Sequence, residues 1–365
     1  MKKLIVPALI LLIASCSKDA EEILKKDTFT ETPSEPTNDE NEEEEMQDED
    51  GQEEQSTENS SNKAPVLTLK TYLINEHSAP QTFIGFIEAN DEDGDEITYS
   101  IVSDTDIIID ETTGELQVGP NLHLDYETIN NLEFTIAAFD GKTITEEDYN
   151  LIIEDIDETT ILTDDEEKLI TYFQHLVYWK SDTNTPVEHN QKWKSSMKVH
   201  LDGTISNEFS TTVDEVLQEY NTIFNDSFNI TTVENEGQAN ASLFYGTEAE
   251  LEGVWPDMYD IVEGGGYSGY AITPSLSSEL NNSRIWISNP ATVLLKHELG
   301  HALGFGHSDK CEEENSFLCS QISTDNDFLP IEKDIIRYAY HLGVDEGQSE
   351  TEIEKVLADL IVNER

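Results

Sequence analysis

The most informative segment of the chain reads His297-Glu298-Leu299-Gly300-His301-Ala302-Leu303-Gly304-Phe305-Gly306-His307. If this segment begins as a helix, His297 and His301 lie about one turn apart on the same face, and both imidazoles reach one ion. Gly304 can take a positive φ and end the helix, which turns the chain so that His307 reaches the same ion. Three neutral nitrogen ligands with one open coordination position are typical of catalytic zinc.

Glu298 follows the first of these histidines and is not the third ligand in this arrangement, so it remains available to act on a water molecule. Zinc lowers the pKa of its bound water from about 15.7 toward ~7, which makes a hydroxide-like nucleophile available at neutral pH. Glu298 is therefore expected to be the catalytic general base, which takes the proton of the water and returns it to the leaving amine.

At these residues the chain resembles the metzincin zinc metalloproteases, and the short loop after His307 is most similar to the matrixin branch. The resemblance covers about 190–345 and implies a zinc endopeptidase that acts on a protein or peptide substrate. It also implies that the edge strand with which an extended substrate pairs contains Gly269, Tyr270 and Ala271.

One feature departs from the metzincin pattern. Metzincins place a Met in a turn beneath the zinc, whereas the four Met of this chain all precede His307. Leu318 or Cys319 occupies the corresponding place, and we expect either side chain to form the floor of the site.

The remaining cysteines and histidines are assigned no metal. Cys311 and Cys319 either form a disulfide that closes the loop after the third histidine or remain two buried free thiols. The other histidines without ligand spacing are expected at the surface, and they are His175, His189, His200 and His341.

The N-terminus predicts export. Met1, Lys2 and Lys3 precede an apolar run, and Ala14-Ser15-Cys16 resembles the lipobox of bacterial lipoproteins. The resemblance implies a signal peptide at 1–15 and a lipid on Cys16 that tethers the protein to a membrane, expected to be the bacterial outer membrane. The acidic residues after Cys16 resemble the signals that export some lipoproteins to the cell surface, and the alternative is a plain solvated linker. Residues 16–62 are acidic and poor in apolar residues, so we expect a disordered stalk. With 78 acidic against 20 basic residues and a formal charge of −58, the chain is not expected to bind nucleic acid.

Residues 63–158 are expected to form an all-β domain, because short alternating runs are separated by turns rich in Asp, Gly and Asn. The order of its acidic residues resembles the cadherin repeat, which implies a Greek-key sandwich with Ca²⁺ at both ends. The carboxylates that this resemblance assigns to Ca²⁺ are Glu76, Asp125, Glu127, Asp155 and Asp157 at one end and Asp91, Asp93 and Asp140 at the other. The alternative is a solvated acidic sandwich without bound metal.

Residues 159–345 are expected to form a second, α/β or α+β domain of the metzincin type, since helical and strand patterns are interspersed there. The expected helices are 162–179, 212–225, 290–303 and 334–340, and the expected strands are 197–201, 228–233, 241–245, 270–272 and 284–288. The charged tail, 346–365, is expected to be helical.

The sequence therefore predicts a lipid-anchored zinc endopeptidase with a cadherin-like spacer, whose cofactors are Zn²⁺ and Ca²⁺. The first alternative is a surface adhesion protein whose zinc domain binds partners without catalysis. A zinc amidase that acts on peptidoglycan is the second alternative, but it does not call for an edge strand.

Overall fold

The computed structural model describes residues 61–179, 186–225, 227–273 and 278–365. Cys16, the predicted signal peptide and the predicted stalk lie outside these residues, except for the last two positions of the stalk. In the described parts, no helix combines the length and the apolar character that crossing a membrane requires.

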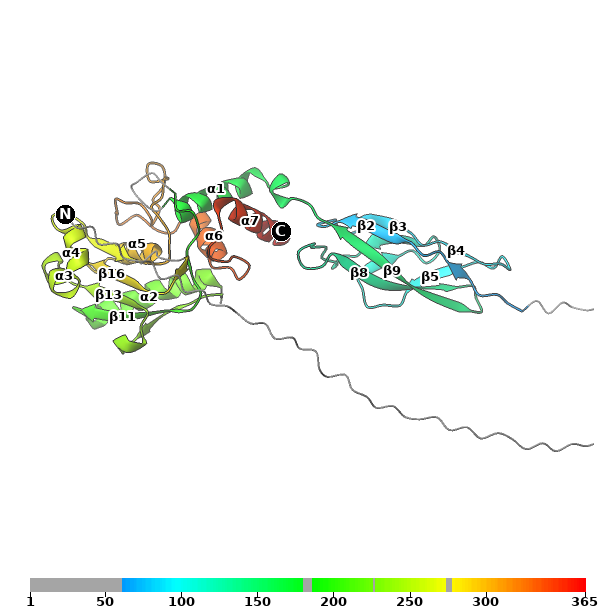
Figure 1. Cartoon of the computed structure of the whole chain (residues 1–365), viewed down its shortest axis with the longest axis horizontal. Helices are drawn as coiled ribbons and strands as arrows, with labels where there is room; N and C mark the ends of the chain where they lie inside the picture. The colour runs from blue at the N-terminus through cyan, green and yellow to red at the C-terminus, as the bar shows by residue number, and fades with distance from the viewer. Residues whose placement is uncertain (1–60, 180–185, 226, 274–277) are drawn as a thin grey trace, which may run out of the picture. The chain divides into compact units, whose positions relative to one another are not determined.

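Residues 61–158 form an all-β sandwich (Figure 1). One sheet has the strand order β2-β9-β8-β5, the other has the order β3-β7-β6, and β1 pairs with β4. The strands are β1 Val66–Leu67, β2 Thr71–Asn75, β3 Phe83–Phe86, β4 Ala89–Asn90, β5 Thr98–Ile101, β6 Ile107–Ile109, β7 Glu115–Val118, β8 Asn131–Phe139 and β9 Ile144–Glu154. Alternate residues face inward, and Leu116, Phe134, Ile136 and Leu151 are among the most deeply buried.

The long hairpin of β8 and β9 extends beyond the sequence-based expectation. The apolar pattern predicts strands at 134–139 and 149–153. In the structure the first of these strands, β8, already begins at Asn131, and the second, β9, already begins at Ile144. The first half of β9 contains three exposed acidic residues, Glu146, Glu147 and Asp148. An apolar pattern therefore does not reveal this part of the strand. Backbone pairing with β8 maintains the strand there, because hydrogen bonds between strands do not depend on apolar side chains.

The C-terminal region is an α/β domain with a five-stranded sheet of order β12-β11-β13-β16-β14. All neighbours in this sheet are parallel except β14 and β16, which are antiparallel. The strands are β10 Lys192–Trp193, β11 Met197–Gly203, β12 Ile230–Val233, β13 Ala241–Tyr245, β14 Gly269–Ile272, β15 Glu279–Leu280 and β16 Ser283–Ile287. The sheet therefore ends in a strand that runs against its neighbour.

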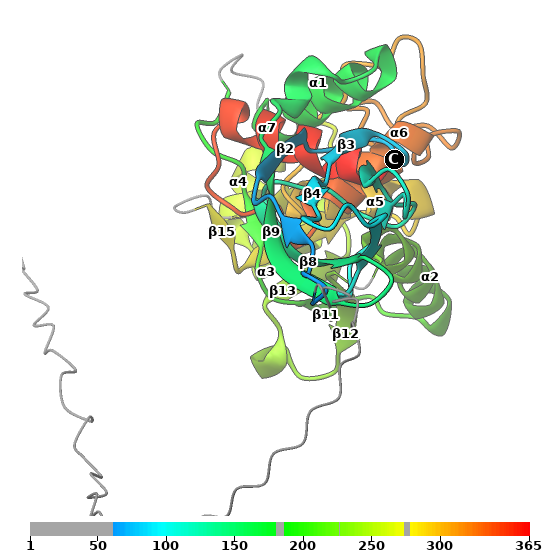
Figure 2. The same ribbon diagram turned by 90° about the vertical axis from the view of Figure 1, so that its right-hand side faces the viewer.

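The helices of this domain are α1 Asp164–Tyr178, α2 Asn207–Phe224, α3 Glu248–Val254, α4 Pro256–Val262, α5 Thr292–Ala302, α6 Pro330–Ala339 and α7 Glu350–Asn363. The short 3₁₀ helices are η1 Glu158–Thr160 and η2 Glu236–Gln238. One continuous apolar core joins α1, α2, α5, α6 and α7 to the sheet. Helices α1 and α7 lie side by side in both views (Figures 1 and 2).

Two helix starts differ from the sequence-based expectation. Helix α2 begins at Asn207 rather than at 212, because the Ser206 hydroxyl accepts a hydrogen bond from the backbone N–H of Phe209 and caps the helix. Helix α6 begins at Pro330 rather than at 334, where the fixed φ of proline suits the first helical position.

The predicted charged tail is part of the C-terminal core. Residues 350–363 form α7, as expected for a helical tail, and Ile353, Leu357 and Ala358 are almost fully buried. They pack in the same apolar core as α1 and α6. The predicted domain end at 345 therefore excludes a helix that belongs to the core. Most residues of α7 are charged or polar and its apolar face is narrow, so the sequence does not reveal that the helix is packed.

Candidate metal centre

Helix α5 carries the first two histidines, and a glycine turn returns the third. His297 is buried and His301 is half-buried on one face of α5. Gly304 has a φ of 100°, and the N–H of Phe305 donates to the carbonyl of Gly300. As the sequence predicts, this turn brings His307 back, and one nitrogen from each of the three imidazoles lies within 4.8 Å of the others.

The tautomers of two imidazoles follow from their hydrogen bonds. Nδ1 of His297 lies 2.9 Å from the carbonyl oxygen of Phe317, and Nδ1 of His301 lies 2.9 Å from that of Phe305. A carbonyl oxygen only accepts, so each Nδ1 carries the proton, and each neutral ring has its lone pair on Nε2.

The two Nε2 atoms lie 3.0 Å apart, which places two lone pairs face to face. A cation between them removes this repulsion. A proton is a poor substitute, since burial lowers the pKa of His297 to about 4. The arrangement of donors therefore fits a zinc ion held by His297, His301 and His307.

Glu298 is buried and lies next to Gly269 of β14. Its side chain is 4% exposed, and burial raises its pKa to about 8. A Cβ atom added to Gly269 at the start of β14 would lie 2.6 Å from Oε1 of Glu298. Glycine at position 269 therefore leaves the space that the carboxylate occupies.

The predicted edge strand, Gly269, Tyr270 and Ala271, lies in β14, the last strand in the order of the five-stranded sheet. Gly269 pairs with Ile287 of β16 in antiparallel register. The strand that resembles a substrate-binding edge thus lies against the carboxylate of Glu298.

Leu318 and Phe317 form the floor beneath α5. A Cβ atom added to Gly300 would lie 2.8 Å from Cδ2 of Leu318 and 2.8 Å from Cε2 of Phe317, so the helix packs directly on this loop. Both side chains are fully buried. The sequence leaves open whether Leu318 or Cys319 forms this floor. Leu318 is the one that contacts α5 at Gly300, whereas Cys319 is bonded to Cys311.

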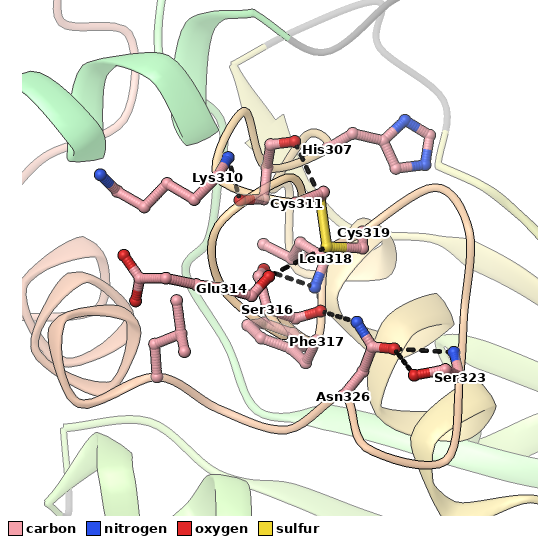
Figure 3. The surroundings of a disulfide bond; sticks show 12 residues. His307, Lys310, Cys311, Glu314, Ser316, Phe317, Leu318, Cys319, Ser323 and Asn326 are labelled. Atoms are coloured by element: carbon pink, nitrogen blue, oxygen red, sulfur yellow. Dashed lines mark hydrogen bonds between the residues drawn. A yellow bond between two sulfur atoms is a disulfide. The ribbon is translucent and has the colours of Figure 1, made fainter.

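Cys311 and Cys319 form a disulfide, which settles the choice between a bridge and two free thiols (Figure 3). Their Cα atoms are 5.6 Å apart. The same loop is also held by the side chain of Asn326, which donates to the carbonyl of Ser316 and accepts from the hydroxyl of Ser323. The bridge closes the loop that follows the third histidine.

His175 is not a plain surface residue. Its Nε2 donates to the carbonyl oxygen of His307 at 3.1 Å, and Leu176 accepts from the N–H of Gly306. Helix α1 therefore supports the segment that carries His307, although 132 residues separate His175 from His307. No sequence spacing signals such a contact. Of the other three histidines, His189 is exposed and His200 and His341 are half-buried.

One of the two predicted calcium groups is assembled in part. Carboxylate oxygens of Glu76, Asp125 and Glu127 lie within 4.8 Å of one another. Asp157 instead caps η1 by accepting from the backbone of Thr159, and neither it nor Asp155 belongs to an oxygen cluster in the described chain. These two predicted ligands are thus not brought to the cluster.

Three residues that the sequence did not indicate extend this cluster. Nε2 of His77 lies 3.1 Å from a carboxylate oxygen of Glu158. Carboxylate oxygens of Glu127, Glu158 and Asp359 of α7 lie within 4.8 Å of one another. Burial raises the pKa of Asp359 to about 6, and the charges of Asp125 and Glu158 act in the same direction. A helix 200 or more residues away in sequence supplies Asp359, so no local pattern reveals it.

The second predicted calcium group is assembled differently from the expectation. Asp91 and Asp93 cluster with Asp95, not with Asp140. Asp140 accepts hydrogen bonds from the side chain of Asn62 and from the backbone of Lys142 and Thr143. The ammonium group of Lys142 lies 2.7 Å from Asp95, so a lysine already neutralises part of this group. The three clustered carboxylates lie in one turn between β4 and β5, whereas Asp140 lies in the turn between β8 and β9.

No protein-family model matches the chain, and no curated protein matches it. Among solved structures it is similar to human protocadherin-24 EC1-2, with 18% identity, a TM-score of 0.25, and coverage of 38% of this chain and 53% of that chain. It is also similar to the third cadherin domain of human protocadherin 7, with 29% identity, a TM-score of 0.24, and coverage of 27% and 94%. The chain thus spans about half of the protocadherin-24 structure. The sandwich assignment rests on the strand pairing of the chain itself.

Proposed function

We propose that the protein is a zinc-dependent endopeptidase of the metzincin type. The observation that carries this proposal is the pair of Nε2 atoms of His297 and His301, 3.0 Å apart with both Nδ1 atoms engaged by carbonyl oxygens. Both lone pairs point to one place, and His307 contributes a third nitrogen there. Such a set of donors suits zinc better than Ca²⁺ or Mg²⁺, which prefer oxygen ligands.

Zinc bound by these histidines would supply a Lewis acid that polarises the scissile carbonyl and acidifies water. Glu298 would take the proton from the attacking water and deliver it to the leaving amine. The backbone of β14 would hold an extended peptide beside this carboxylate.

The test uses the full-length chain expressed with zinc. Metal content is measured, and hydrolysis of a denatured protein and of a peptide library is followed with and without a chelator. We expect one zinc per chain and hydrolysis that the chelator stops. Glu298→Gln should retain zinc and lose about 10²–10⁴-fold in turnover. A zinc-free chain, or hydrolysis that the chelator leaves unchanged, would overturn the proposal.

The alternatives give different outcomes in the same experiment. An adhesion protein would bind zinc and a partner without hydrolysing any peptide, and Glu298→Gln would leave partner binding unchanged. A peptidoglycan amidase would release new amino groups from purified peptidoglycan but not from the peptide library. The proximity of β14 and Glu298 favours the endopeptidase, because an extended peptide needs a strand edge beside the general base.

We propose that Ca²⁺ binds the cluster of Glu76, Asp125 and Glu127, with Glu158 and Asp359 as additional ligands. The closeness of these carboxylates favours this second function, since Ca²⁺ takes six to eight oxygen ligands and relieves their mutual repulsion. Calorimetric titration of the metal-free chain with Ca²⁺ should show binding that Glu127→Gln weakens. A titration without heat or saturation would contradict it.

We also propose that Cys16 carries a lipid that tethers the protein to a bacterial outer membrane, with the folded domains at the cell surface. The proposal rests on the sequence of the N-terminus alone. Mass spectrometry of the mature N-terminus after expression in a lipoprotein-processing host tests it, and Cys16→Ser should release the protein from the membrane fraction.

A further inference from the structure

A buried carboxylate outside the histidine cluster connects to the structures that hold the metal site. Glu332 lies in the first turn of α6 and is fully buried. Its carboxylate accepts from the hydroxyl of Tyr172 at 2.8 Å, from the hydroxyl of Ser316 and from the backbone N–H of Leu329 at 2.9 Å. All of these donors are neutral, so Glu332 serves as a hydrogen-bonding centre.

One of these donors, the hydroxyl of Ser316, belongs to the turn beneath α5. Ser316, whose hydroxyl donates to Glu332, directly precedes Phe317, whose carbonyl accepts from Nδ1 of His297. The hydroxyl of Ser316, which donates to Glu332, accepts from the N–H of Leu318 at 3.0 Å. Glu332 therefore determines where the carbonyl that orients His297 lies.

Another donor to Glu332, the hydroxyl of Tyr172, also contacts the segment that follows His307. Tyr172 of α1 contacts Glu332, and its hydroxyl lies 2.7 Å from the hydroxyl of Ser308. Ser308 directly follows His307, and its N–H donates to the carbonyl of Leu318. One carboxylate thus supports the surroundings of two of the three histidines.

We propose that Glu332 is a positioning residue of the metal centre, which holds the Phe317 carbonyl against His297 and the Ser308 segment beside His307. This inference rests on the proposed zinc site. A ligating imidazole keeps its orientation and basicity only while the acceptor of its other N–H stays in place, and loss of such outer support typically costs 10–100-fold in metal affinity. Without Glu332, the turn that carries this acceptor loses its hydrogen bond through Ser316.

The experiment measures how fast zinc leaves the protein. Full-length wild type and Glu332→Gln are loaded with zinc, mixed with an excess of a chromophoric chelator, and the transfer of zinc is followed. We expect transfer from Glu332→Gln to be at least about tenfold faster, because the amide directs an NH₂ group at donors that need an acceptor. Asp334→Asn, which removes an acid from an exposed position of the same helix, should stay within about twofold of wild type.

A loss of general stability has to be distinguished from a loss of positioning. Val213→Ala shortens a buried side chain of α2 and serves as a variant with a lowered melting temperature. Equal zinc transfer from Val213→Ala and Glu332→Gln at matched loss of melting temperature would overturn the inference. If Glu332→Gln does not fold, Ser316→Ala and Tyr172→Phe each remove one donor, and unchanged transfer from both would overturn it as well.

The outcomes also separate this inference from the proposed function. A wild-type chain that binds no zinc would overturn the proposed function and the inference together. A wild-type chain that binds zinc and releases it no more slowly than Glu332→Gln would overturn only the role of Glu332.

Discussion

Gly269 and Glu298 belong to a strand and a helix, and the space that a Cβ would occupy on Gly269 lies 2.6 Å from Oε1 of Glu298. Strand β14 and the carboxylate of Glu298, for which we propose the roles of substrate strand and general base, are therefore packed against each other because residue 269 has no side chain. Any other residue at position 269 must displace the carboxylate or the strand.

Gly269→Ala should lower turnover by about 10–100-fold while zinc stays bound, because a displacement of about 1 Å at a catalytic group has costs of this size. Steady-state hydrolysis of a peptide and metal content are the measurements. Gly253→Ala is the matched control, since a Cβ there has no neighbour within 4 Å. Equal turnover of both variants would show that the contact between Gly269 and Glu298 has no catalytic consequence.

Reduction of the bridge between Cys311 and Cys319 should destabilise the protein by up to about 2.5 kcal/mol, the chain-entropy value for a closed loop of eight residues. Urea unfolding with and without a phosphine reductant measures the difference. The Cys311→Ser/Cys319→Ser variant should not respond to the reductant. Intact-mass analysis that finds two free thiols in the untreated protein would refute the bridge itself.

Glu166 should stabilise the protein in a pH-dependent way. Hydrogen bonding to Arg365 lowers the pKa of Glu166 to about 2, and the backbone of Thr163 contributes. Because the folded-state pKa lies below the ordinary value of about 4.5, the stabilisation is complete above pH 4.5 and disappears as the pH falls toward 2. Glu166→Gln should therefore lower the melting temperature by a few degrees at pH 7, an effect of about 1 kcal/mol. A difference that persists at pH 2 would contradict this linkage.

Asp359→Asn should raise the melting temperature of the protein at pH 8 when divalent cations are absent. Burial raises the pKa of Asp359 to about 6, so the stabilisation of its neutral form is present below about pH 4 and is lost as the pH rises through 6. The amide avoids that loss. Added Ca²⁺ should raise the melting temperature of wild type more than that of the variant, since binding to the folded state stabilises it. Equal shifts in both proteins would remove Asp359 from the proposed calcium ligands.

The arrangement of the histidine cluster was largely predictable from the sequence. His297 and His301 are four residues apart, and a helix with 3.6 residues per turn places such residues on one face without help from the rest of the fold. Gly304 could likewise be assigned a positive φ, because glycine adopts that conformation at little cost. The approximate positions of α1 and α5 also followed from local apolar spacing.

The support of the cluster was not predictable in this way. His175, Glu332 and Asp359 act on residues that are distant in sequence, and their roles depend on which helices the apolar core brings together. Asp140 shows the converse, since it resembles a ligand in sequence but accepts hydrogen bonds from its own turn and from Asn62 and does not join the cluster.

The chain by itself thus determined the spacing of the three clustered histidines, the glycine turn that joins them and the change from strands to helices near residue 158. Only the tertiary structure decided that Leu318 packs under α5, that Glu332 anchors the turn beneath His297, and that Asp359 joins the acidic cluster. The physical reason is that backbone geometry sets the positions of neighbours within one or two turns, whereas contacts between distant segments depend on close packing of the whole core.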